Sequence, residues 1–269
     1  MNRWLKISLV SLLAIGIVVL MFVANNVQQN KVLQDPEIII SVVEDGENQF
    51  LTEKELKIRL QHNNLIYPNQ QYQHLDLSKI EASILKMNEV HSAEVFTEIG
   101  DQWRIELNLR NPIARIFNNR GETFYLDSDG GKMLPSNLHT ARVIVVTGNI
   151  PDQLKSPNVD RINSSPKLRE KYALEEIYNV TNYISKDPFF KAMLAQIQLE
   201  ENGDFKMVPQ VGGHIINFGS GKNTEEVKAK FEKLKIFYQQ GIPYEGWRKY
   251  SEVSVKFKGQ IVCKKKPRW

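Results

Sequence analysis

The chain has 269 residues, of which 42% are hydrophobic and 25% are charged, and its formal net charge is +4. A chain of this length can bury hydrophobic cores without covalent staples, and its single cysteine, Cys263, excludes an intramolecular disulfide. The small positive charge is not arranged as a basic face interleaved with aromatic residues, which argues against a nucleic-acid-binding protein.

The first predicted element is a membrane anchor. Residues 7–24 read ISLVSLLAIGIVVLMFVA and carry no charge. As a helix they would reach about 27 Å, close to the hydrocarbon thickness of a bilayer. Arg3 and Lys6 precede the run, so the positive-inside rule leaves residues 1–6 in the cytoplasm and sends the rest across. The alternative is a cleaved signal peptide. Signal peptides usually have a shorter apolar region than residues 7–24, and Phe22-Val23-Ala24 is a poor match to their A-x-A-like cleavage site.

Residues 25–35 are expected to form a polar spacer, and residues 36–112 a small α+β unit. A β-branched run over residues 37–43 predicts its first strand. Two later stretches alternate apolar and polar residues on either side of Gly100-Asp101. This pattern predicts a β-hairpin with one solvent-exposed face and one buried face, and Trp103 is expected on the buried face.

Two helices are predicted between the first strand and the hairpin. Thr52 and Glu55 form a capping box that marks the start of one helix. The second is expected to begin at Asp76 or at Ser78, where Glu81 would complete another capping box. The expected order of elements in this unit is therefore β-α-α-β-β.

Residues 113–264 are predicted to form a second unit, a mostly antiparallel β domain with packed helices, and residues 265–269 a basic tail. One helix is expected over residues 166–185, and another is capped by Asn223 and ends at Gly241. The rest of the unit is expected to contain a loop over residues 148–165 and strands over residues 113–117, 123–126, 132–134, 143–147, 197–199, 205–208, 214–218, 253–257 and 260–264. The predicted fold class is α+β with an N-terminal transmembrane helix.

No residue pattern predicts an enzyme, so we expect no cofactor, no metal and no small-molecule substrate. Cys263 lies in the last predicted strand, where a packing role is favoured over a nucleophile. Asp127-Ser128-Asp129-Gly130 is similar to the start of a calcium loop but lacks the later ligands, so a hairpin turn is favoured. The histidines form no metal-binding spacing and are each expected on the surface or in loops: His62, His74, His91, His139 and His214.

Three aromatic residues, Tyr244, Trp247 and Tyr250, cluster before the last predicted strand. One interpretation is a cover over the sheet. The other is a partner-binding hot spot, since exposed aromatic residues often anchor interfaces.

The order of these elements resembles the FtsQ/DivIB family of bacterial cell-division proteins, whose first soluble unit is a POTRA domain. Residues 110–115 (RNPIAR) resemble the family's E-x-x-P-x-A-R stretch, and residues 125–130 (YLDSDG) its Y-L-D-x-x-G turn. The closing residues 253–262 (VSVKFKGQIV) resemble its V-D-L-R-Y-x-x-G-x-x-V ending. The layout is shared over nearly the whole chain.

The resemblance implies a non-catalytic, single-pass protein of the inner membrane at the division site, with most of the chain outside the cytoplasm. Such proteins link early and late components of the divisome, contact other divisome membrane proteins, and bind the FtsB–FtsL coiled-coil pair through the end of the β domain. Strand addition is the expected route, because a terminal edge strand offers unpaired backbone groups to a partner strand.

The expected partner-binding residues lie in the closing hairpin, which is formed by the strands predicted over residues 253–257 and 260–264. The resemblance places Phe257, Gly259 and Val262 there, and strand continuity adds their neighbours. The full set is Val253, Val255, Phe257, Gly259, Ile261, Val262, Cys263 and Lys264, with Tyr244, Trp247 and Tyr250 as aromatic candidates. Lysines near the strand would discourage self-pairing and favour an acidic partner. The alternative is that this strand is covered within the fold.

Two other functions remain open at this point. A membrane-tethered cell-envelope hydrolase fits the expected compartment, but no catalytic group set supports it. A POTRA-type chaperone or assembly module would need repeated POTRA units or a barrel, whereas the sequence predicts one unit and no run of paired membrane-length strands.

Overall fold

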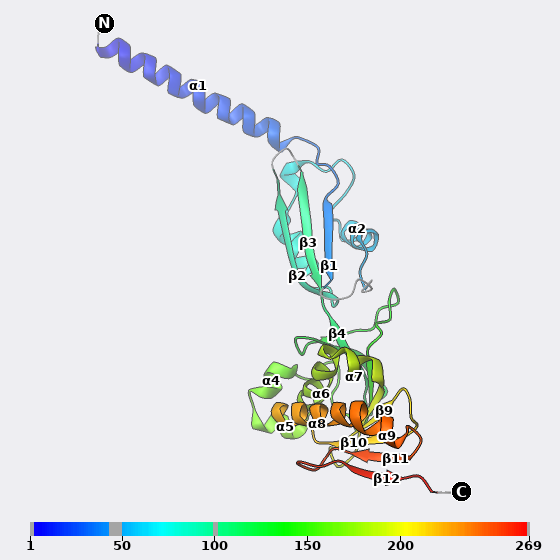
Figure 1. Cartoon of the computed structure of the whole chain (residues 1–269). Coiled ribbons are helices and arrows are strands. Elements are labelled where there is room, and N and C mark those ends of the chain that lie inside the picture. Colours follow the sequence, from blue (N-terminus) through cyan, green and yellow to red (C-terminus); the bar gives the residue numbers. More distant parts are fainter. Residues whose placement is uncertain (1–2, 43–49, 99–101, 268–269) are drawn as a thin grey trace. The chain divides into compact units, whose positions relative to one another are not determined.

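The computed structural model describes three stretches of the chain, residues 3–42, 50–98 and 102–267, without the side chains of residues 3–10, 28 and 42. Contacts divide the chain into two units: residues 1–43 and 51–109 form unit 1, and residues 44–50 and 110–269 form unit 2. Helix α1 (Arg3–Gln29) begins unit 1 (Figure 1).

Helix α1 is longer than the expected anchor at its C-terminal end. It continues to Gln29, so the first residues of the expected spacer over residues 25–35 are helical. The side chain of Asn30 closes this end by donating from Nδ2 to the carbonyl oxygen of Asn26 at 2.9 Å. Among the residues whose side chains the structure describes, which in α1 begin at residue 11, no helix is both long enough and apolar enough to cross a membrane.

The rest of unit 1 confirms the predicted β-α-α-β-β order. Its three-stranded sheet has the order β1-β3-β2, with β1 parallel and β2 antiparallel to the central β3. Its elements are β1 (Glu37–Val42), α2 (Glu53–His62), a short 3-10 turn (Tyr72–His74), α3 (Leu77–Ile84), β2 (Val90–Thr97) and β3 (Trp103–Leu109). The Gly100-Asp101 turn lies outside the described residues.

The two helix starts differ in how well the sequence predicted them. Thr52 caps α2 as expected, because its Oγ1 accepts from the Glu55 backbone N–H at 3.2 Å. Asp76 caps α3 by accepting from the Lys79 N–H at 3.0 Å, so the second capping box is wrong. Glu81, which was expected to complete that box, instead accepts from the backbone N–H of Val95 on β2 at 3.3 Å.

Trp103 is buried in the core of unit 1, as predicted, with 3% of its surface exposed. It belongs to the same buried cluster as Leu56, Ile80 and Ile105, and its Nε1–H donates to the carbonyl oxygen of Gln34 at 2.9 Å. The indole therefore combines a large buried apolar surface with a satisfied polar atom, the arrangement that favours burial of tryptophan.

Nine strands form one sheet in the described part of unit 2, in the order β12-β11-β10-β9-β8-β7-β4-β5-β6 (Figure 1). The sheet is mostly antiparallel as expected, but the β4/β7, β7/β8 and β10/β11 pairs are parallel. The strands are β4 (Pro112–Phe117), β5 (Thr123–Asp127), β6 (Lys132–Met133), β7 (Ile144–Gly148), β8 (Leu194–Leu199), β9 (Phe205–Pro209), β10 (Ile215–Gly219), β11 (Tyr250–Ser254) and β12 (Val262–Lys265).

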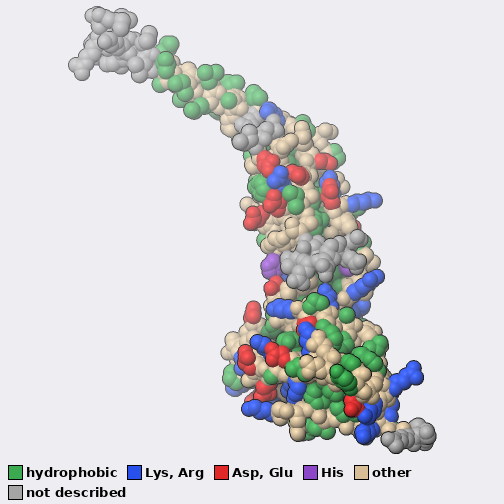
Figure 2. Space-filling model, viewed as in Figure 1, with side chains coloured by type: hydrophobic (Ala, Val, Ile, Leu, Met, Phe, Trp, Pro, Cys, Tyr) green, Lys and Arg blue, Asp and Glu red, His purple; other side chains and the backbone are tan. Residues whose placement is uncertain are grey.

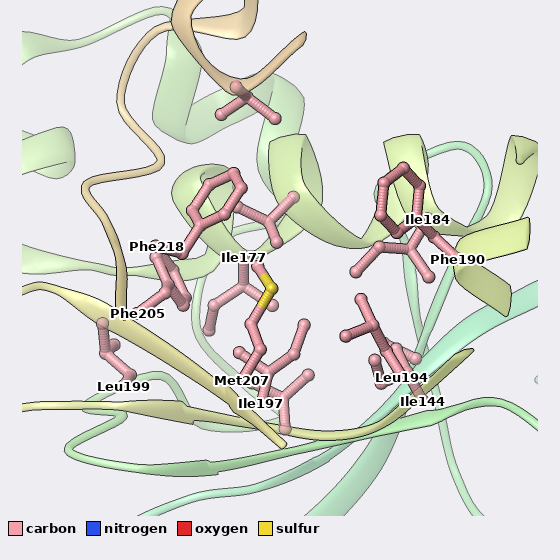
Figure 3. Packing of buried hydrophobic residues seen from close by; sticks show 14 of the residues in the cluster. Ile144, Ile177, Ile184, Phe190, Leu194, Ile197, Leu199, Phe205, Met207 and Phe218 are labelled. Carbon is pink, nitrogen blue, oxygen red and sulfur yellow. The ribbon is translucent and has the colours of Figure 1, made fainter. Parts of the chain in front are cut away.

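The helices of unit 2 pack on one face of this sheet. Figure 3 shows Ile177, Ile184 and Phe190 of the helical layer facing Ile197 and Met207 of the strands, and all five side chains are buried. The helices are α4 (Val159–Asn163), α5 (Pro166–Lys171), α6 (Leu174–Lys186), α7 (Pro188–Met193), α8 (Thr224–Ile236) and α9 (Ile242–Glu245), with a π-helical turn (Phe237–Gly241) before α9.

Three helix predictions in unit 2 need correction. The loop expected over residues 148–165 contains α4, and the single helix expected over residues 166–185 breaks at Tyr172, whose backbone is extended. The buried carboxylate of Asp152 accepts from the Ala173 N–H at 2.8 Å, which fixes this break from a distant loop. Gly241 does not end its helix; Gly246, at φ 89°, follows α9 and does so.

The turn at residues 127–130 is the hairpin turn favoured over a calcium loop. The Asp127 side chain is fully buried, and its Oδ1 accepts from the backbone N–H groups of Asp129 at 3.0 Å and Gly131 at 2.6 Å. Its Oδ2 pairs with Arg110 at 2.7 Å. Gly130 adopts φ 78°, which glycine tolerates best, so both the aspartate and the glycine have a structural role here.

The burial of Trp103 gives a stability test for unit 1. Trp103→Ala should lower the free energy of unfolding of this unit by ~3–5 kcal/mol, because it leaves a cavity and an unpaired Gln34 carbonyl. Chemical denaturation followed by circular dichroism measures the change. Ile39→Ala, at a side chain that is 38% exposed on the same sheet, serves as the control and should cost much less. A near-neutral effect of Trp103→Ala would contradict the core assignment.

Candidate partner-binding site

The closing hairpin of unit 2 forms one edge of its sheet. β11 pairs in parallel with β10 on one side and antiparallel with β12 on the other. β12 pairs only with β11 among the described strands, and it is the last strand of the sheet (Figure 1). One flank of β12 therefore has no strand beside it in the described part of the chain.

Backbone hydrogen bonds identify which groups of β12 point away from the sheet. The Lys266 N–H donates to the Lys249 carbonyl at 3.0 Å, on the side of β11. Alternate residues of a strand direct their N–H and C=O groups to the same side. Val262 and Lys264 therefore direct these groups toward β11, and Cys263 and Lys265 direct theirs toward the open flank.

The expected site residues fall into a buried set and a surface set. Val253 and Val255 are fully buried, so their side chains support the hairpin from the core. Phe257 and Val262 are 47% and 46% exposed, and with Lys264 they line one groove of about 610 Å³. The strand expected over residues 253–257 lies three residues earlier in the chain, because β11 runs from Tyr250 to Ser254.

The remaining residues of the hairpin shape its turn and its inner side. Gly259 adopts φ 74°, a conformation that favours glycine in the turn between the two strands. Ile261 and Cys263 are partly buried and pack against the main core of unit 2. Burial raises the pKa of the Cys263 thiol, which keeps it in the neutral form suited to packing.

The three aromatic candidates divide between the two interpretations. Tyr244 on α9 is 90% exposed and available to a partner. Trp247 is 42% exposed and lies against Tyr238, with ring centroids 5.7 Å apart. Tyr250 is half-buried against the core, and its hydroxyl donates to the carboxylate of Glu245 at 3.1 Å.

Basic side chains gather around the open edge. Figure 2 shows lysine and arginine side chains at the end of unit 2 that carries the C-terminus. Lys264, Lys265 and Lys266 are all exposed on or just after β12. Like charges on an edge strand oppose pairing with a second copy of the same strand and favour an acidic partner.

Comparison with known families agrees with this architecture. Residues 111–264 match the family described as FtsQ/DivIB, C-terminal related. The chain belongs to this family. Residues 36–108 match the POTRA-like domain, so the resemblance drawn from the order of the elements is confirmed. A comparison with curated proteins found no match. Membership of the FtsQ/DivIB family makes this a division-related protein with protein partners.

His214 of this FtsQ/DivIB domain lies in the loop just before β10, one of the two positions expected for the histidines. Its burial was not expected: only 2% of it is exposed, and its Nε2 lies 2.5 Å from the Tyr238 hydroxyl. The sequence contains a sign of this burial. His214, Ile216 and Phe218 are alternate residues, which in an extended segment point to the same side, and Ile216 and Phe218 are buried. Burial lowers the pKa of His214 below its ordinary value of 6.5, and the positive charge of Lys266 acts in the same direction.

This lowered pKa predicts how the stability of the FtsQ/DivIB domain depends on pH. The unfolded chain protonates His214 near pH 6.5, whereas the folded chain resists protonation. The contribution of neutral His214 to the free energy of unfolding is therefore complete above pH 6.5. It is lost as the pH falls from 6.5 toward the pKa of His214 in the folded protein. Denaturant unfolding between about pH 7.5 and about pH 5.5 should show this loss, and His214→Gln should reduce it. His62→Gln, at an exposed histidine, is the control; an unchanged pH dependence in His214→Gln would contradict the assignment.

Proposed function

We propose that this protein is a non-catalytic, membrane-anchored scaffold of the divisome that binds an FtsB/FtsL-like coiled-coil partner by strand addition to β12. In this role it links early and late division proteins and contacts other divisome membrane proteins. The observation that supports the proposal is the open flank of β12, the last strand of a nine-stranded sheet. Backbone groups on such a flank are a template for another strand.

The partner strand would bond to the outward N–H and C=O groups of Cys263 and Lys265. On the face of the sheet that points away from the core, side chains of the partner strand would contact the apolar Val262 and the cationic Lys264. On the inner side they would meet the partly buried Cys263, which packs against the core. This arrangement favours a partner segment that alternates apolar and acidic residues, since cross-strand pairs of opposite charge stabilise a ladder and like charges destabilise it.

The surface residues around this edge complete the proposed interface. Phe257 and Tyr244 offer exposed aromatic surface, of the kind that anchors many interfaces. The buried Val253 and Val255 contribute by holding β11 in place, which fixes the position of β12.

We also propose that α1 anchors the protein in the inner membrane by a single pass, with residues 1–6 in the cytoplasm and both units outside it at the division site. The uncharged run over residues 7–24 supports this. Leu12, Leu20 and Phe22 are 74%, 69% and 71% exposed on the helix, and a helix that is apolar all round requires an apolar environment.

A proline placed on the open flank tests strand addition directly. Lys265→Pro should remove one outward N–H but keep the ladder between β11 and β12, whose bonds use the alternate residues. Its affinity for the purified extracytoplasmic FtsB/FtsL-like pair should fall about tenfold or more, with little change in thermal stability. Binding is measured by titration calorimetry with the full chain in detergent.

Lys265→Ala is the matched control, because it removes the same charge but keeps the backbone donor. It should bind more tightly than Lys265→Pro. Equal affinities of the two variants would mean that the outward N–H has no role and would overturn strand addition at this flank.

A further inference from the structure

Lys233 on α8 holds the loop that joins β11 to β12. Its Nζ donates to the carbonyl oxygens of Val255 at 3.0 Å, Phe257 at 2.6 Å and Gln260 at 3.1 Å. A lysine ammonium has three protons, so every donor of this side chain is directed at the one loop. The neighbouring residues Phe231 and Leu234 are fully buried, which fixes this part of α8 in the core.

β11 is fixed by its pairing with β10 and by the buried Val253, so β12 is the less firmly held strand of the hairpin. β12 has four residues, three of them exposed, and its register with β11 is interrupted by a bulge between Tyr250 and Glu252. A second tether lies on the outer side, where Lys256 Nζ pairs with Asp204 of the turn between β8 and β9 at 2.5 Å. The loop is thus held by the hydrogen bonds from Lys233 of α8 and by the ion pair between Lys256 and Asp204.

We propose that Lys233 is a positioning residue for partner binding, which holds the loop so that β12 presents its open flank in one arrangement. This inference rests on the proposed strand addition. A strand that is already ordered loses less conformational entropy when a partner binds than one that must be ordered first. Lys233 therefore acts on affinity without touching the partner.

Lys132 provides a matched control at the other end of the same sheet. Its Nζ also donates to three carbonyl oxygens, those of Gln153 and Ser156 at 2.8 Å and Pro157 at 3.1 Å. It lies on β6, the strand at the edge opposite β12. Removing Lys132 tests what the loss of such a cluster of bonds does to the domain in general. Lys228, an exposed lysine on α8, controls for the loss of charge on the helix.

The experiment compares Lys233→Met, Lys132→Met and Lys228→Met in the full chain. Hydrogen exchange without a partner reports the order of the hairpin, and calorimetric titration with the purified FtsB/FtsL-like pair reports affinity. Lys233→Met should speed the exchange of the Val262 and Lys264 amides, leave β8 and β9 protected, and weaken binding about tenfold. Lys132→Met and Lys228→Met should bind within about threefold of the unchanged protein.

Two results would overturn the proposal: Lys233→Met binding within about threefold of the unchanged protein, or Lys132→Met weakening binding as much as Lys233→Met. If Lys233→Met does not fold, Lys233→Gln decides, because its shorter amide has two donors and cannot satisfy all three carbonyls; binding weakened by more than about threefold, with β8 and β9 still protected from exchange, supports positioning, and binding within about threefold contradicts it. If the unchanged protein itself does not bind the pair, strand addition fails, while the exchange of the β12 amides still shows whether Lys233 orders the hairpin.

Discussion

In the described part of the chain, β12 is hydrogen-bonded to a neighbouring strand along one side, and this constraint connects most features of unit 2. Its neighbour β11 is paired on both flanks and carries the fully buried Val253, so the hairpin is anchored in the core through β11. The Lys233 bonds fix the loop between the two strands. The sheet therefore ends in an ordered strand whose outward backbone groups have no strand beside them in the described part of the chain. Such an edge is suited to binding another polypeptide.

An exposed edge is also a risk, because it can pair with a copy of itself. The lysines at positions 264, 265 and 266 oppose self-pairing by charge repulsion, and the bulge in β11 interrupts the regular register. The opposite edge is blunted differently, since β6 has only two residues. The two edges of one sheet thus differ in length, since β12 has four residues and β6 has two.

Local patterns in the sequence predicted those features whose cause lies within a few residues. The Thr52 and Asn223 caps, the Asp127 turn and the alternation around Trp103 belong to this class. The turn of the closing hairpin, which contains Gly259, was also predicted at the position where the structure has it. The sequence could not show that β11 runs parallel to β10, because that pairing joins residues far apart in the chain. For the same reason it missed the helix break enforced by Asp152 and the Lys233 bonds.

Backbone hydrogen exchange of the full chain with and without the purified FtsB/FtsL-like pair tests the central claim most directly. Strand addition predicts that the amides of Cys263 and Lys265 become strongly protected in the complex, because they donate to the added strand. The amides of Val262 and Lys264 already face β11 and should change less. A tight complex in which the Cys263 and Lys265 amides exchange as fast as in the unbound protein would rule out strand addition at this flank.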